Sequence, residues 1–136
     1  MLNTNRIEEK TATLWKKLEE KFPGKKDDVD LLRYYYSDAT RRFEEGSFEM
    51  AYFSAYKIIR DETVVDPKEY VSDKREGEPS SFSEIRTILL HSRRKKVEIN
   101  PKRITEIKAK LPQYTLEIIL RASTFIEKLA AEENNC

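Results

Sequence analysis

Arg86 and His91 are the two residues of this chain whose types and spacing could support a reaction. His91 is the only histidine, and four residues separate it from Arg86. An imidazole, with an unperturbed pKa near ~6.5, can take a proton from a ribose 2′-hydroxyl or return one to a leaving oxygen. A guanidinium can hold a phosphate through two hydrogen bonds and stabilise charge that gathers on it. The pair therefore predicts metal-independent RNA cleavage by 2′-hydroxyl attack.

One copy of this pair supplies a single proton-transferring group, whereas 2′-hydroxyl attack needs both an acid and a base. A two-fold dimer would bring two copies to one cleft, so a homodimer is expected. Five positions along a helix leave the two side chains about 140° apart. They converge only if the helix ends or unwinds near His91, or if the Arg and His of different subunits cooperate. The alternative is an ordinary helix-end residue at His91 and a solvated Arg86.

Basic residues are concentrated directly behind the histidine. Between His91 and Lys110 there are eight basic and two acidic residues, a local formal charge of +6 in a chain of +1. Such a patch would bind a phosphate backbone with a steep salt dependence. A solvated helix end is the alternative, because cations are favoured near a helix C-terminus. The residues expected to contact nucleic acid are Arg93, Arg94, Lys95, Lys96, Lys102 and Arg103.

The remaining composition limits the other kinds of chemistry. The sequence has no Cys or His cluster for zinc and no glycine-rich phosphate loop, so no metal and no cofactor are expected. Lys and Arg (26) nearly balance Asp and Glu (25), so bulk charge does not single out nucleic acid as a partner. A single cysteine, Cys136, and the lack of a signal peptide or spanning apolar run predict a soluble cytoplasmic protein. High charge with few glycines also suggests a thermophilic source.

Apolar residues recur at helical spacing along most of the chain, and no segment alternates as a strand does. We expect an all-α fold, a single domain over residues 1–136 built as an antiparallel bundle of five to six helices. Residues 133–136 should fray. The expected helices cover about residues 4–22, 27–45, 47–61, 81–96, 101–111 and 113–132.

Residues 61–80 differ in character from the helices. Seven of these twenty residues are acidic and three are basic, and Pro67, Gly77 and Pro79 interrupt the segment. This composition predicts a long mobile loop within one domain. One hypothesis is that the acidic loop covers the basic segment when no ligand is bound, and the alternative is a plain solvated loop.

Two helices offer surfaces for a protein partner. Tyr34, Tyr35 and Tyr36 point in three directions on a helix, so at least one ring should be partly exposed. The helix that begins after Ser47 is apolar over a wide arc, which is typical of a central helix or of one that meets a second subunit. A non-catalytic interaction module that uses these tyrosines or this apolar face is therefore the second functional hypothesis.

The Arg86-to-His91 stretch resembles the motif of the HEPN superfamily, small helical proteins that include ribonuclease toxins. That family carries Arg, four to six residues, then His, often with a polar residue after the Arg, and Thr87 stands there. The toxin branch often has Tyr two residues after the His, where this chain has Arg93. The resemblance implies RNA binding or cleavage in a dimer cleft, with Arg86 and His91 as its catalytic residues.

The resemblance covers roughly residues 30–130. The segment from Asp38 to Tyr52 is similar to the family's first hairpin, and residues 104–112 look like the helix after the motif. Residues 35–39 are also similar to small archaeal helical domains of unknown function, and more loosely to tetratricopeptide hairpins.

Overall fold

The structure is a computed structural model that describes residues 4–60, 74–75, 80–91 and 101–131. For residues 4–12 and for His91 it describes the backbone alone. The described helices are α1 (Thr4–Lys21), a 3₁₀ turn (Pro23–Lys25), α2 (Lys26–Glu44), α3 (Phe48–Ile59), α4 (Phe82–His91), α5 (Pro101–Ala109) and α6 (Leu111–Ala130). This part of the chain contains no strand, which confirms the predicted all-α fold.

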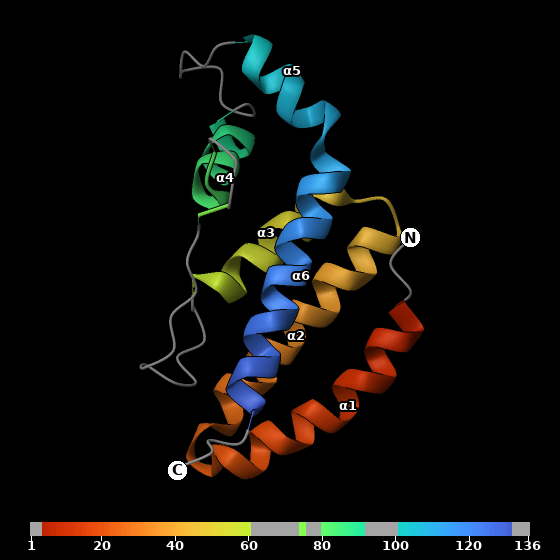
Figure 1. Ribbon diagram of the computed structural model, residues 1–136, viewed down its shortest axis with the longest axis vertical. Helices are drawn as coiled ribbons and strands as arrows, with labels where there is room; N and C mark the ends of the chain where they lie inside the picture. Colours follow the sequence, from red (N-terminus) through yellow and green to blue (C-terminus); the bar gives the residue numbers. More distant parts are fainter. Residues whose placement is uncertain (1–3, 61–73, 76–79, 92–100, 132–136) are drawn as a thin grey trace.

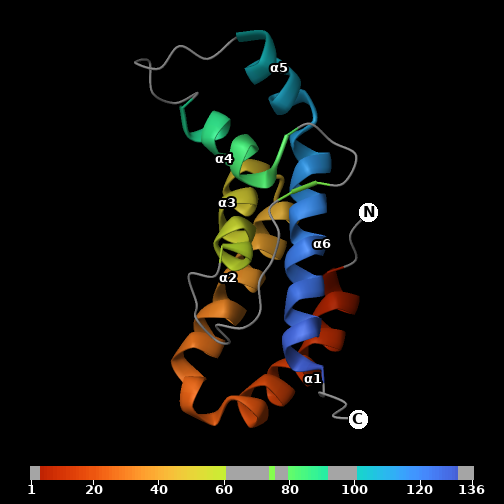
Figure 2. The same ribbon diagram turned by 60° about the vertical axis from the view of Figure 1, so that its left-hand side comes forward.

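The helices form an elongated antiparallel bundle (Figures 1 and 2). α2 and α6 run side by side in opposite directions along the long axis. α1 packs against α2 and α6 at one end of the bundle. α3 packs against the same two helices toward the opposite end. α4 lies on α3, and α5 lies at the far end, where it leads into α6.

Local signals in the sequence set most helix ends. Pro23 and Gly24 follow α1. Gly46 has a φ of 83°, and the Ser47 N–H donates to the carbonyl of Arg42 at 2.8 Å, which closes the C-terminus of α2 as a Schellman motif does. The Ser81 hydroxyl accepts from the Glu84 N–H at 3.1 Å, so Ser81 is the N-cap of α4.

The predicted and observed helix bounds differ mainly around α4 and α6. α4 is described as far as His91, and the rest of the helix predicted over residues 81–96 lies outside the described residues. α6 begins at Leu111, two residues before the predicted start, so Pro112 stands in its first turn. The predicted tail at residues 133–136 also lies outside the described residues.

One apolar cluster joins the six α-helices of the described residues. Trp15 and Leu18 enter it from α1, and α5 contributes Ile107. α3 is the most deeply buried helix, because α2, α4 and α6 cover its apolar arc. The prediction of a central helix is confirmed. Most of this arc is covered within the chain, and its use by a protein partner stays a prediction. The arc residues that are buried within the chain are Ala51, Tyr52, Ala55, Tyr56, Ile58 and Ile59.

Candidate functional site

Arg86 lies at the contact between α4 and α3. α4 buries Phe82, Ile85 and Leu89 in the core, and the Tyr52 hydroxyl of α3 donates to the Phe82 carbonyl at 2.7 Å. This anchoring leaves the half-buried Arg86 at the edge of the contact. Its guanidinium carbon lies 5.0 Å from the centre of the Tyr56 ring.

His91 is the last residue of α4. It follows Arg86 by five positions, so its Cα lies about 140° further round the helix axis. The His91 side chain and residues 92–100 lie outside the described residues. The predicted contacts at Arg93, Arg94, Lys95 and Lys96 are therefore outside them as well.

Lys102 and Arg103 stand in the first turn of α5. Arg103 donates from Nη2 to the Ser80 hydroxyl, and the same nitrogen lies 3.9 Å from Glu84 Oε2. These contacts tie α5 to the start of α4. Lys102 is exposed. Two predicted phosphate-binding residues thus lie on the helix beside the one that carries Arg86.

A buried arginine that was not predicted as a site residue, Arg75, also contacts Ser80 at the start of α4. The Arg75 side chain is 5% exposed, and its Nε and Nη2 donate to the two carboxylate oxygens of Glu117, the second bond at 3.0 Å. Its guanidinium also lies 4.6 Å from the centre of the Tyr114 ring, and Nη1 donates to the Ser80 carbonyl at 3.3 Å. Arg75 and Ser80 are therefore buried against α6 and α4, whereas Lys74 is exposed, and the rest of the predicted loop over residues 61–80 lies outside the described residues.

A second polar group lies between α2 and α3. Asp38 is 8% exposed and accepts from Arg41 Nη2 at 2.7 Å, Arg42 Nε at 2.8 Å and the Ser54 hydroxyl at 2.6 Å. Burial acts to raise the pKa of Asp38. The hydrogen bonds from Ser54, Arg41 and Arg42 outweigh burial, so this pKa lies below its ordinary value. Arg41 and Arg42 follow Asp38 by three and four positions, a spacing that places them beside it on a helix. This spacing is the sequence signal from which the group could have been predicted.

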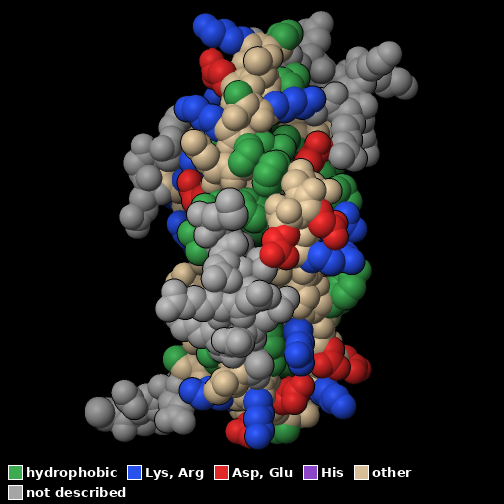
Figure 3. Space-filling model, turned by 90° about the vertical axis from the view of Figure 1, so that its right-hand side faces the viewer, with side chains coloured by type: hydrophobic (Ala, Val, Ile, Leu, Met, Phe, Trp, Pro, Cys, Tyr) green, Lys and Arg blue, Asp and Glu red, His purple; other side chains and the backbone are tan. Residues whose placement is uncertain are grey.

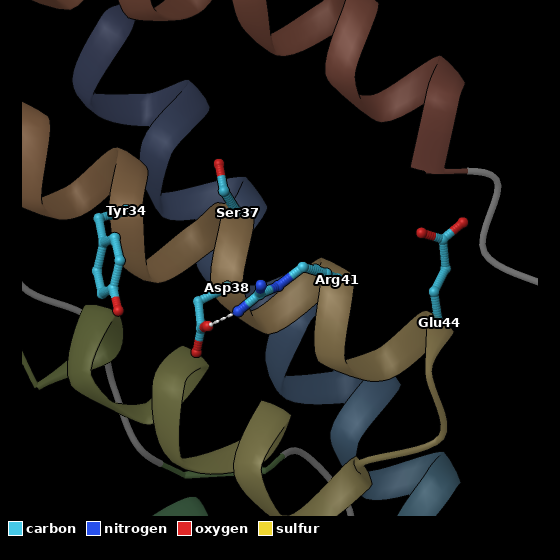
Figure 4. A pocket seen from close by; sticks show the side chains of 5 residues that line it. All are labelled: Tyr34, Ser37, Asp38, Arg41 and Glu44. Carbon is cyan, nitrogen blue, oxygen red and sulfur yellow. Dashed lines mark hydrogen bonds and ion pairs between the residues drawn. The ribbon is translucent and has the colours of Figure 1, made fainter.

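An open pocket of about 370 Å³ borders Asp38 (Figure 4). All of its lining residues come from α2, and Arg41 spans the middle of the group, with one nitrogen bonded to Asp38. The lining residues are Tyr34, Ser37, Asp38, Arg41 and Glu44.

The three consecutive tyrosines point in different directions, as predicted. Tyr34 is 62% exposed, Tyr35 is half-buried, and Tyr36 is buried in the core, where burial raises its pKa. The ring of Tyr35 receives the Lys57 ammonium of α3 at 5.0 Å and packs edge-on against Tyr34. The α2–α3 contact therefore has an exposed aromatic ring at its rim.

Within the described residues, no three or more His, Cys, Asp or Glu side chains gather as a metal site would require. No helix in the same part of the chain is both long and apolar enough to cross a membrane. The chain matches no protein-family model, no curated protein and no solved structure.

Proposed function

We propose that the protein is a HEPN-like RNA-binding domain that cleaves RNA without a metal, in the cleft of a homodimer. The position of Arg86 carries the proposal. Its guanidinium is oriented by Tyr56 at the α4–α3 contact, and it precedes His91 on the same helix. An arginine that is half-buried against an aromatic ring has a restricted geometry, which suits it to hold a phosphate.

In the proposed reaction, His91 of one subunit takes the proton from a ribose 2′-hydroxyl. The 2′-oxygen attacks the adjacent phosphorus, and the bond to the 5′-oxygen breaks. The second copy of the histidine gives a proton to that 5′-oxygen, so the products are a 2′,3′-cyclic phosphate and a 5′-hydroxyl. Arg86 stabilises the negative charge on the phosphate in the transition state.

The basic residues around this pair would position the RNA. Lys102 and Arg103 stand on α5, beside α4, and the run of residues 93–96 follows His91 directly. Phosphate contacts of this kind hold a strand in register and weaken steeply as salt increases. A cytoplasmic location fits a chain with one cysteine.

Cleavage of RNA by highly purified protein in a chelator tests the proposal. We expect His91→Ala to lower the rate by at least about 100-fold, because general acid–base catalysis contributes that much or more. Arg86→Ala should lower it as well. Arg33→Ala, which removes an exposed arginine of α2, is the matched control and should keep the rate.

Equal cleavage by the wild type and by His91→Ala, with both folds intact by circular dichroism, would overturn the proposed mechanism. The solution mass is a second check. A protein that stays monomeric at the assay concentration contradicts the two-copy cleft.

The second candidate is a non-catalytic module that binds another protein. Four large apolar side chains that are exposed in the described residues favour it, and Arg86 already has a packing role on Tyr56. This module would cleave no RNA and would bind none at low salt. The four exposed side chains are Leu31, Tyr34, Met50 and Leu120.

A further inference from the structure

Cationic side chains lie over aromatic rings at two successive helix contacts. Arg86 of α4 lies over Tyr56 of α3, and Lys57 of α3 lies over Tyr35 of α2. Tyr56 and Lys57 are neighbours in the chain. The two contacts therefore leave α3 from adjacent positions and extend to the helices on either side of it.

Tyr34 continues this arrangement on α2. Its ring packs edge-on against Tyr35 at 5.8 Å between centroids and is 62% exposed. The open pocket begins at Tyr34 and contains Arg41, whose side chain is also 62% exposed. We call Arg86, Tyr56, Lys57, Tyr35 and Tyr34 the cation–aromatic row.

The members of the row are suited to different parts of a nucleic-acid strand. Tyr56 is 9% exposed and lies under Arg86, so it offers no free face to a base. Arg86 and Lys57 are both half-buried, and their N–H groups are the donors that would bind phosphate in this row. Tyr34 offers an exposed ring on which a base can stack. Single-stranded nucleic acid is bound in this way, by cations that track the backbone and aromatic rings that stack the bases.

The charged side chains near Tyr34 balance one another, since Arg41 and Arg42 stand against the carboxylates of Asp38 and Glu44. The carboxylate of Asp38 already accepts hydrogen bonds from Arg41 and Arg42, so these two arginines offset its charge. Arg41 is the more exposed of the two and faces the pocket (Figure 4). Glu44 stands at the other end of the pocket and would limit how far a phosphate backbone extends along α2.

We propose that single-stranded RNA is the ligand of this row. The strand runs from the scissile phosphate at Arg86 across α3 at Lys57 and ends with a base stacked on Tyr34 beside Arg41. This inference rests on the proposed function, because it takes the phosphate at Arg86 as the starting point of the strand. A duplex cannot use the row in the same way, since its bases are stacked on one another and are not available to Tyr34.

Fluorescence anisotropy with a labelled oligouridylate of about twelve nucleotides, 2′-O-methylated so that it resists cleavage, tests the inference. We expect Tyr34→Ala to weaken binding about tenfold, which is in the range of one lost base stack. Tyr34→Phe keeps the ring and should bind within about twofold of the wild type. Leu120→Ala, a truncation of an exposed apolar side chain on α6, should leave binding unchanged.

Two further measurements sharpen the test. Lys57→Met should reduce the slope of log affinity against log salt by about 0.7, the value for one lost phosphate contact on a single strand. An RNA hairpin of the same length should bind Tyr34→Ala and the wild type equally. Because Tyr34 is largely exposed, circular dichroism should report an unchanged fold for its variants.

The same binding measurements separate a failure of the single-strand path from a failure of the proposed function. If Arg86→Ala weakens oligouridylate binding but Tyr34→Ala does not, the strand does not follow the row and the proposed function stands. If Tyr34→Ala weakens the hairpin and the single strand equally, the assignment to single strands is wrong. If the wild type binds neither RNA at low salt, both proposals are overturned.

Discussion

At the scale of single residues, Asp38 shows how a buried carboxylate joins two helices. It is buried between α2 and α3, and its donors come from both, Arg41 and Arg42 from its own helix and Ser54 from the next. A buried charge is tolerated when hydrogen bonds satisfy it in this way. Asp38 therefore supports the α2–α3 hairpin that carries Tyr34 and Lys57.

The lowered pKa of Asp38 makes this support depend on pH. Because the pKa in the folded protein lies below the unfolded value of about 3.9, the folded state gains stability from ionised Asp38. That stability is fully present above the unfolded pKa and is lost as the pH falls through the folded pKa. We expect Asp38→Asn to lower the free energy of unfolding by about 2 kcal/mol at neutral pH.

Urea denaturation at neutral pH and at several acid pH values measures this difference. The stabilities of the wild type and of Asp38→Asn should converge as the pH falls through the folded-state pKa of Asp38, which lies below the ordinary value for an aspartate. A difference that stays constant from neutral pH into acid would show that Asp38 contributes shape and not charge.

At the scale of elements, basic side chains from one segment fix another segment in place. The Lys21 ammonium at the end of α1 donates to the carbonyls of Leu129 and Ala131 at 2.8 and 2.9 Å, and so binds the negative C-terminus of α6. Arg75 likewise joins two segments. It donates to the carbonyl of Ser80, just before α4, and to the carboxylate of Glu117 in α6. These contacts connect elements that are far apart in the sequence.

The contact between Arg75 and Glu117 should be measurable as a coupling. Arg75 is almost fully buried and Glu117 is 40% exposed, so we expect either Arg75→Met or Glu117→Ala to lower the free energy of unfolding by about 2 kcal/mol. The double variant should lose less than the sum of the two. Chemical denaturation of all four proteins measures the coupling, and strictly additive losses would contradict a direct interaction.

At the scale of the whole molecule, one core holds the helices together. The buried cluster includes residues of α1, α2, α3, α4, α5 and α6, and Trp15 lies within it against Tyr36. Outside this core, Lys and Arg are interspersed with Asp and Glu on the face in Figure 3. The nearly balanced charge of the chain is thus mixed on this face.

A single shared core predicts cooperative unfolding. Trp15 fluorescence, which reports the packing of α1, and far-ultraviolet circular dichroism, which reports all the helices, should give the same denaturation midpoint. Two separated midpoints would instead show that α1 leaves the bundle before the other helices unfold.

The sequence by itself determined the fold class and most helix ends. Pro23-Gly24, Gly46, the Ser81-to-Glu84 cap and Pro101 act through backbone geometry or hydrogen bonds within about one helical turn. Apolar spacing likewise predicted which side of each long helix is buried, because the period of a helix is independent of its neighbours. These signals could be interpreted without knowing where any other helix lies.

Only the tertiary structure decided which polar side chains meet. Arg75 and Glu117 are 42 positions apart, and Asp38 and Ser54 are 16 apart, so each pair forms only after separate segments have docked. The choice of Tyr36 and not Tyr35 as the buried ring, and the placement of Arg86 on Tyr56, also depend on the rotation of one helix against another. That rotation follows from the fit of many side chains at once, which no local pattern in the sequence contains.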